Sequence, residues 1–305
     1  MKKTLLVGSF GAKNIGDELI LQAALQKHKS VIVATANAEA SIDFSPTWFA
    51  TIPSFPCGIK SLFRFFLSPK QRKIYQATAP QIKKMVFPGG GLFKNNFKAV
   101  WIWTLNVFWL KHFFPNKKII FEAQGVDKLN NYFVQKLALW SFNQAHRVSV
   151  RDEQSKQNLI NLGYEHKIKV VPDVAHEFLQ TQNLLPIKTN QKQILIQASK
   201  NFNAEKLRTQ IAKRFPQHQI QFVAFDAIDI PVIRRNTHLP TEKIVFPQTY
   251  QDTINLFQNS QVFIGQRFHF LILAHLINPK RTFLLHKPYA PKTETLAKSL
   301  GIEKF

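Results

Sequence analysis

The residues of this chain best suited to chemistry are an arginine and a histidine two positions apart, Arg267 and His269. They follow a short apolar run at 262–264 and precede a second apolar run that is typical of a helix. Residues at i and i+2 of a regular helix point away from each other, so these two side chains can serve one site only from the turn before the helix. That turn also offers backbone N–H donors and the positive end of the helix dipole. The motif predicts a receptor for a small, multiply charged anion; the structural alternative is a surface arginine with a histidine packed beneath the helix.

A glycine-rich loop near the N-terminus is the second candidate. It follows the first apolar run and ends in Asn14, Gly16, Asp17 and Glu18. Its glycines match neither the dinucleotide-binding fingerprint nor the P-loop spacing, so no nucleotide is assigned to it. Two interpretations stay open. Asp17 and Glu18 cap the following helix and complement its dipole, or the loop hydrogen-bonds a sugar acceptor.

Two further apolar runs end in residues suited to ligand contact. Gly89, Gly90 and Gly91 follow one of them, where they allow close backbone approach to a ligand or, alternatively, form a tight turn. Arg151 follows the other, and its planar guanidinium could clamp a phosphate or a carboxylate. Asp152 is positioned to cap the next helix, and an ion pair between Arg151 and a neighbouring acid is the structural alternative.

Short β-rich runs alternate with longer helical ones, which favours an α/β architecture with parallel sheets. Strands are expected near 4–8, 31–35, 85–88, 118–123, 147–150 and 168–171, and again near 193–197, 219–225, 243–246, 261–264 and 281–285. Helices are expected over 17–28, 98–113, 131–143, 153–162, 204–215, 249–258, 267–277 and 292–300. The stretch 179–192 lacks apolar periodicity and is typical of a linker. We therefore predict two Rossmann-like domains facing a cleft, at 1–180 and 190–305, with ligands beyond the carboxyl ends of the strands.

The charge balance limits the choice of partners. The 305 residues include 41 Lys+Arg against 18 Asp+Glu, a net charge of +23, which favours polyanions. Nucleic acid is not expected, because no recognition helix, Cys/His finger or aromatic RNP strand is found. No spacing of histidine, cysteine and acidic residues resembles a metal site. A lone cysteine, Cys57, and an N-terminal apolar run too short for a secretory signal predict a cytoplasmic protein.

Two segments raise the question of a membrane. Residues 99–110 are almost entirely apolar and contain three tryptophans, but 12 residues cannot span a bilayer as a helix. A buried helix and an interfacial helix remain alternatives for this segment. Residues 60–73 mix bulky apolar side chains with basic ones, so they form either a membrane-surface patch or a solvated helix face.

Taken in order, these motifs resemble the polysaccharide pyruvyl transferase family. The resemblance rests on Asn14-Ile15-Gly16-Asp17-Glu18, Gly89 to Leu92, the Ser149 to Ser155 box, Arg267-Phe268-His269, and a terminal element with Tyr289, Pro291, Lys292, Leu300 and Gly301. It departs from the family pattern at Lys94 or Asn95 after the glycines, at Asp173 to His176, at Gln124 to Asp127, and at Phe268. Most of these changes concern the acceptor side.

The resemblance implies a two-domain fold like that of GT-B glycosyltransferases, with the acceptor on the N-terminal side and the donor on the C-terminal side. It implies transfer of the enolpyruvyl group of phosphoenolpyruvate onto two hydroxyls of a sugar, as a ketal, with release of phosphate. No cofactor or metal is needed. The implied catalytic residues are His269, Arg267 and Asp17. The implied substrate-binding residues are Arg151, Asn14, Gly16, Glu18, Gly89, Gly90, Gly91 and Lys292.

Three partners follow from this interpretation. They are phosphoenolpyruvate, a glycan acceptor that is lipid-linked or polymer-bound, and anionic lipid at the inner face of the cytoplasmic membrane. A GT-B glycosyltransferase with a nucleotide-sugar donor is the alternative function, and a nucleic-acid-binding protein, suggested only by charge, is a weaker one.

Overall fold

The structure is a computed structural model of the chain, and it describes residues 2–67, 69–182, 184, 192–285 and 291–305. The chain divides into two compact units, which are described one at a time. The first comprises Met1–Ala12, Ile20–Ile42 and Thr47–Glu177, and the second comprises Lys13–Leu19, Asp43–Pro46 and Phe178–Phe305. Residues 13–19 and 43–46, which fall within the predicted N-terminal range, thus pack with the second unit.

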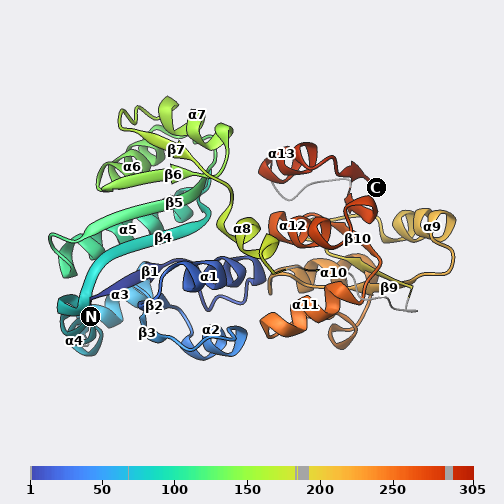
Figure 1. Cartoon of the computed structure of the whole chain (residues 1–305), viewed down its shortest axis with the longest axis horizontal. Coiled ribbons are helices and arrows are strands. Elements are labelled where there is room, and N and C mark those ends of the chain that lie inside the picture. Colours follow the sequence, from blue (N-terminus) through green and yellow to red (C-terminus); the bar gives the residue numbers. More distant parts are fainter. Residues whose placement is uncertain (1, 68, 183, 185–191, 286–290) are drawn as a thin grey trace. The chain divides into compact units, whose positions relative to one another are not determined.

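The first unit is built on a seven-stranded sheet of order β3-β2-β1-β4-β5-β6-β7, with all neighbours parallel. The strands are β1 (Lys3–Val7), β2 (Val31–Thr35), β3 (Ala50–Pro53), β4 (Ile82–Phe93), β5 (Lys118–Val126), β6 (Arg147–Val150) and β7 (Ile168–Val170). The helices are α1 (Ile15–Lys27), α2 (Ala38–Phe44), α3 (Ile59–Leu67), α4 (Pro69–Thr78), α5 (Phe97–Phe113), α6 (Tyr132–Asn143), α7 (Glu153–Asn161) and α8 (Val174–Gln180), with a 3₁₀ turn at Ala79–Gln81 (Figure 1). The parallel sheet expected from the alternating pattern is confirmed.

The tryptophan-rich helix α5 packs on the sheet. Trp103 and Trp109 are buried, and the Trp109 indole N–H donates to the Pro56 carbonyl at 2.9 Å. Residues 99–110 thus form a largely buried helix, on which Trp101 and Phe108 are exposed. Within the described residues, no helix combines the length and the apolar character that crossing a membrane requires.

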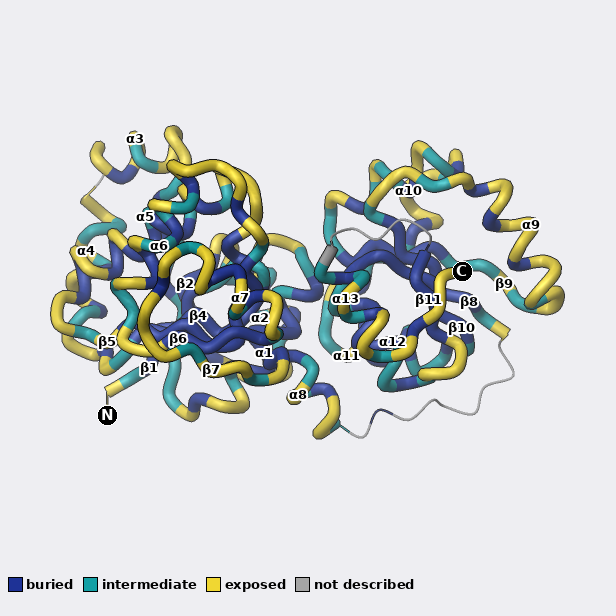
Figure 2. The backbone as a smooth tube through the Cα atoms, turned by 90° about the horizontal axis from the view of Figure 1, so that it is seen from above, coloured by how far each residue is buried: buried dark blue, intermediate teal, exposed yellow. Residues whose placement is uncertain are grey.

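The second unit contains a five-stranded parallel sheet of order β12-β11-β10-β8-β9. Its strands are β8 (Gln193–Ile196), β9 (Gln219–Phe222), β10 (Val262–Gly265), β11 (Thr282–Leu284) and β12 (Glu303–Lys304). Its helices are α9 (Ala204–Arg214), α10 (Asp229–Thr237), α11 (Tyr250–Gln258), α12 (Phe268–Ile277) and α13 (Pro291–Ser299), with 3₁₀ turns at Thr241–Lys243 and Pro279–Arg281. Figure 2 shows the central strands of each sheet in the dark blue of buried residues.

Both faces of this second sheet are covered. Leu207 of α9 and Ile233 of α10 share a core cluster with alternate strand residues such as Ile196 and Ile264. On the opposite face, the ring of Phe257 from α11 stacks on Phe263 of β10, with centroids 5.3 Å apart. The prediction of a strand at 243–246 is wrong. Residues 241–243 form a 3₁₀ turn, and Val245 makes only an isolated bridge to Val223.

Candidate functional site

Arg267 and His269 emerge from the turn that joins β10 to α12. The strand ends at Gly265, and Arg267 lies in the N-cap position with an extended backbone, φ −92° and ψ 142°. His269 belongs to the first turn of α12, which begins at Phe268. The two side chains therefore leave from the irregular start of the helix, as the sequence predicts.

Two aspartates hold the Arg267 guanidinium. Its Nε and Nη2 donate to the Asp229 carboxylate at 2.6–3.0 Å, and its Nη1 lies 3.3 Å from Oδ2 of Asp226. Arg267 is only 8% exposed and Asp229 is fully buried. Such a bidentate pair fixes both position and orientation. The group of Arg267, Asp226 and Asp229, called here the Arg267 cluster, contains two carboxylates for one guanidinium, so the charge of the arginine is more than balanced.

A buried glutamine supports the same turn. Gln197, directly after β8, accepts hydrogen bonds at its Oε1 from the backbone N–H groups of Gln266 and Arg267, at 3.0 and 2.9 Å. Its Nε2 donates to Asp229 at 3.0 Å. Because β8 and β10 are neighbours in the sheet, this one side chain ties their carboxyl ends to the Arg267 cluster.

The N-terminal loop joins this cluster from the other end of the chain. Ile15 N–H donates to the Phe225 carbonyl at 2.9 Å, and Asn14 forms an antiparallel bridge with Asp226. The Asn14 side chain donates to Asp226 at 3.0 Å and accepts from Gly16 N–H at 3.0 Å. One asparagine therefore caps the start of α1 and contacts the carboxylate that faces Arg267.

Gly16 lies directly against the His269 imidazole. A Cβ atom built on Gly16 would be 2.5 Å from His269 Nδ1, closer than real carbon contacts allow. The absence of a side chain at Gly16 is thus what admits the ring. The structure brings four predicted residues together in the second unit: Asn14, Gly16, Arg267 and His269.

Asp17 and Glu18 occupy the first turn of α1. Glu18 is buried at 4% exposure, whereas Asp17 is partly accessible. Asp17 N–H donates to the Asn14 carbonyl at 3.1 Å, so Asp17 is held by the same loop.

Of the predicted C-terminal element, Lys292 lies in the first turn of α13, and Tyr289 falls outside the described residues.

Arg151 lies in the first unit, after β6. Its side chain is 2% exposed, with Nε 3.4 Å from Asp152 and Nη1 3.3 Å from Asp173. A Cβ on Gly125 would lie 2.7 Å from its Nη2, so the guanidinium rests against that glycine. The ion pair that the sequence left open as an alternative is present, and Asp152 also caps α7 by accepting from Ser155 N–H at 2.6 Å.

The triple glycine belongs to the end of β4. Gly89 and Gly90 have φ values of 104° and 88°, in the region that favours glycine. The buried Gln124 side chain donates to the carbonyls of Phe87 and Gly89 at 2.9 and 3.1 Å. These glycines are therefore part of an extended strand held by an amide of β5, rather than a tight turn.

Sequence reasoning did not identify Asp226, Asp229, Gln197 or Gln266. The two aspartates follow β9, just as Arg267 follows β10, so the rule that carboxyl ends of parallel strands share one edge could have found them. No group of three potential metal ligands occurs among the described residues.

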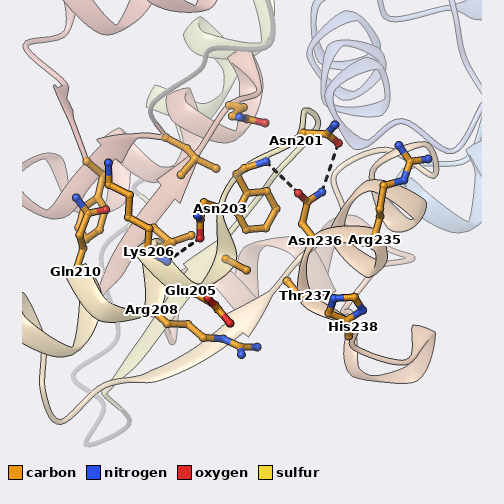
Figure 3. Close-up of a pocket in the computed structure, with 16 residues that line it drawn as sticks. Asn201, Asn203, Glu205, Lys206, Arg208, Gln210, Arg235, Asn236, Thr237 and His238 are labelled. Atoms are coloured by element: carbon orange, nitrogen blue, oxygen red, sulfur yellow. Dashed lines mark hydrogen bonds between the residues drawn. The ribbon is translucent and has the colours of Figure 1, made fainter.

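A pocket of about 890 Å³ lies beside this turn in the second unit (Figure 3). Its wall is formed by the loop after β8, the first turns of α9 and the end of α10, with Gln266 contributed by the turn after β10. The lining residues are Asn201, Phe202, Asn203, Ala204, Glu205, Lys206, Leu207, Arg208, Gln210, Arg235, Asn236, Thr237, His238, Gln266, Leu285 and Phe305.

Two Rossmann-like α/β units, with polar side chains at the ends of their parallel strands, define a GT-B-like protein, as the sequence predicts. The structure is similar to UDP-GlcNAc 2-epimerase from Methanocaldococcus jannaschii, with a TM-score of 0.57 and 14% identity over 99% of this chain and 92% of that one. It is also similar to UDP-GlcNAc 2-epimerase from Neisseria meningitidis bound to UDP-GlcNAc, at 0.58 and 14% over 100% and 87% of the two chains. A third similar structure is Anabaena HepE in complex with UDP-glucose, at 0.56 and 14% over 99% and 89%.

The chain belongs to the polysaccharide pyruvyl transferase family, whose model matches residues 14–278. This match confirms the family that the motifs indicate, and it supports the classification of the protein as a transferase. A comparison with curated protein sequences finds no match.

Proposed function

We propose that the protein transfers the enolpyruvyl group of phosphoenolpyruvate onto two hydroxyls of a sugar in a cell-surface polysaccharide or its lipid-linked precursor. The observation that supports this most directly is the meeting of Asn14 and Gly16 with Arg267 and His269. These residues belong to two separate motifs of the family, and the fold joins them around one guanidinium and one imidazole.

The reaction requires a proton at one carbon and a nucleophile at the next. His269 protonates the methylene carbon, because imidazole exchanges protons near neutral pH. The first sugar hydroxyl then adds to the central carbon and passes its proton to Asp17, the more accessible carboxylate of its loop. The C–O bond to phosphate breaks as Asp17 passes its proton to the departing phosphate. The second hydroxyl then closes the ketal and gives its proton to the His269 imidazole, which restores the general acid.

Within the Arg267 cluster the two edges of the guanidinium have different tasks. Asp229 holds Nε and Nη2 and so orients the group. The longer contact from Nη1 to Asp226 is the one a substrate oxygen replaces, since it is the weaker of the two. Arg151 is proposed to provide a second cation for the donor, with Gly89, Gly90, Gly91, Glu18 and Lys292 as further substrate contacts.

The test is phosphate release from phosphoenolpyruvate in the presence of candidate acceptor glycans. His269→Gln should lower the rate by about 10²–10⁴-fold, the usual contribution of a general acid. His275→Gln on the same helix is the matched control. Equal rates for His269→Gln and wild type, at equal melting temperatures, would reject the role of the imidazole.

A nucleotide-sugar glycosyltransferase is the second candidate, favoured by the similarity to structures that hold UDP-sugars. Thermal-shift measurements separate the two. Stabilisation by phosphoenolpyruvate supports pyruvyl transfer, whereas stabilisation by UDP or GDP alone supports the alternative.

We also propose that the protein contacts anionic lipid at the inner face of the cytoplasmic membrane, through the outer side of α3. Ile59, Phe63, Phe66 and Leu67 form one stripe of this helix and are 62–88% exposed, while Phe65 faces inward against Trp109. Basic residues accompany the stripe at Lys60, Arg64, Lys70 and Lys73, all exposed. An apolar stripe flanked by cations is the pattern of interfacial helices.

Sedimentation with vesicles tests this contact. Wild type should bind phosphatidylglycerol vesicles at low salt and release them at high salt, since each basic residue near the surface adds about 1 kcal/mol. Lys60→Glu/Arg64→Glu should weaken binding strongly. The matched control is Lys167→Glu/Lys169→Glu at exposed positions of the first unit, which alters net charge equally. Equal losses in both variants would indicate charge alone and reject α3 as the contact.

A further inference from the structure

The pocket beside the Arg267 turn contains a buried hydrogen-bond donor that the protein does not use. Gln266 is fully buried, and its Oε1 accepts from the backbone N–H groups of Ser199 and Lys200 at 2.7 and 2.9 Å. These two bonds fix the amide orientation, and Nε2 has no hydrogen-bond partner among the described residues. A buried amide N–H left without an acceptor is energetically costly, because it has lost its bonds to water without replacing them. Since Gln266 lines the pocket, an acceptor atom of a ligand is the expected partner.

The same pocket is electropositive. Its lining includes Lys206, Arg208 and Arg235 against a single acid, Glu205. Within the part of the chain that the structure describes, none of these four side chains forms an ion pair, in contrast to Arg151 and Arg267. Three cations without carboxylate partners, two from α9 and one from α10, line this pocket and favour an anionic ligand.

Hydrogen bonds within the protein pre-organise the wall of this pocket. Figure 3 shows Asn236 bonded on both sides: its Oδ1 accepts from Phe202 N–H at 3.2 Å, and its Nδ2 lies 3.5 Å from Asn201 Oδ1. Asn203 caps α9 by accepting from Lys206 N–H at 2.8 Å. These bonds hold the loop in place, so little ordering is needed on binding.

The size and the place of the pocket indicate which substrate it accepts. At about 890 Å³ it lies near the upper end of the ~300–1,000 Å³ range of small-molecule sites, well beyond the need of a three-carbon acid. Leu207 and Phe305 add apolar surface for carbon-rich parts of a ligand. Gln266 immediately precedes Arg267, and Gln197 binds the backbone of both, so a ligand here borders the Arg267 cluster.

We infer that this pocket of the second unit binds a sugar phosphate or diphosphate, namely the phosphate-bearing end of the acceptor, which differs from the N-terminal acceptor side that the family resemblance implies. The identification of the ligand as the acceptor rests on the proposed pyruvyl transfer, whereas the binding of a phosphorylated sugar does not. Gln266 Nε2 donates to a ligand oxygen, and Lys206, Arg208 and Arg235 neutralise the phosphate.

Isothermal titration calorimetry without phosphoenolpyruvate tests the site. The probes are farnesyl-diphosphate-linked N-acetylglucosamine, UDP-N-acetylglucosamine and N-acetylglucosamine alone. Gln266→Glu keeps the Oε1 acceptor and replaces the donor by a charge that repels phosphate. This variant and Lys206→Glu/Arg208→Glu should each weaken binding of a phosphorylated probe by about tenfold or more. Lys167→Glu/Lys169→Glu, at exposed positions of the first unit, carries the same charge change and should bind as wild type.

Whichever phosphorylated probe binds more tightly identifies the source of the phosphate. The inference is overturned if wild type binds none of the probes, if the neutral sugar binds as tightly as the phosphorylated ones, or if the pocket variants bind like wild type. These results stay separate from those on pyruvyl transfer. If wild type binds a phosphorylated probe and the pocket variants do not, but wild type releases no phosphate from phosphoenolpyruvate, the pocket is retained and the reaction is rejected. If wild type releases phosphate but binds no probe, the reaction is retained and the pocket is rejected.

Discussion

Among the residues that the structure describes, each unit has one buried arginine at the end of a parallel strand, and each arginine contacts two aspartates. In the first unit, both partners of Arg151 also cap helices: Asp152 accepts from Ser155 N–H and Asp173 from Ala175 N–H. In the second unit, Asp229 and Asp226 also accept from backbone N–H groups, those of Phe225 and Ile228, but Asp226 binds Asn14 as well, and the His269 imidazole lies against Gly16. The guanidinium is thus tied into the architecture in both units, and in the second unit a loop that also contacts an imidazole joins its carboxylates.

Two glycines give the sharpest test of this contrast, because each lies against one of the polar side chains. Gly16→Ala would place a methyl 2.5 Å from His269 Nδ1, and Gly125→Ala would place one 2.7 Å from Arg151 Nη2. We expect Gly16→Ala to lower kcat by about 10²-fold or more, since a displaced general acid loses its contribution. Gly125→Ala should chiefly lower stability, by about 1–3 kcal/mol, the usual cost of overpacking.

Phosphate-release kinetics and urea unfolding measure the two effects on the same samples. Ala212, which is exposed on α9, provides a background control as Ala212→Gly. If Gly16→Ala retains full kcat while unfolding more easily, the imidazole is a packing group and the contrast between the units fails.

The two aspartates of the Arg267 cluster should respond in opposite directions. Asp229→Asn loosens the bidentate grip on Nε and Nη2, so KM for phosphoenolpyruvate should rise about tenfold. Asp226→Asn removes the charge that competes for Nη1 but keeps an oxygen for Asn14, so KM should fall severalfold. Steady-state kinetics at saturating acceptor measure both, and a rise of KM in both variants would show that the two carboxylates act as one unit.

The sequence predicts strand ends well and tertiary partners poorly. The turn before α12, the cap at Asp152 and the two parallel sheets follow from local patterns, because capping and apolar periodicity are local effects. The bond between Asn14 and Asp226 joins residues 212 positions apart, and only the folded chain selects that pair. The strand expected at 243–246 failed for a similar reason, since Val245 meets just one bridging partner, Val223.

The first unit has a second buried charge group, which extends the comparison to pH. Burial alone would raise the pKa of the Glu122 carboxyl, but the His28 imidazole, 3.5 Å away, and the charges of Lys27 and Arg147 together hold this pKa below its ordinary value. A lowered pKa in the folded state stabilises the fold above the unfolded value of about 4.5, and this stabilisation is lost as pH falls through the folded pKa.

Glu122→Gln should therefore cost about 1.5–3 kcal/mol at pH 7, the range for hydrogen bonds to charged groups, and should flatten the acid limb of the stability curve. Urea unfolding between pH 3 and pH 7 measures the slope. Glu153→Gln on the exposed side of α7 is the control. An unchanged slope in Glu122→Gln would mean that the network does not stabilise the first unit.

The smallest expected effect concerns the lone thiol, also in the first unit. Burial raises the pKa of Cys57 to about 12, although the hydrogen bond with Asn106 acts in the opposite direction. Because the thiolate is the reactive form, iodoacetamide at pH 8 should label Cys57 much more slowly in the native protein than in urea. Mass spectrometry over time follows the labelling. Rapid labelling of the native protein would show that the loop around Cys57 opens readily. The first unit would then be less rigid than the comparison of its buried charged groups assumes.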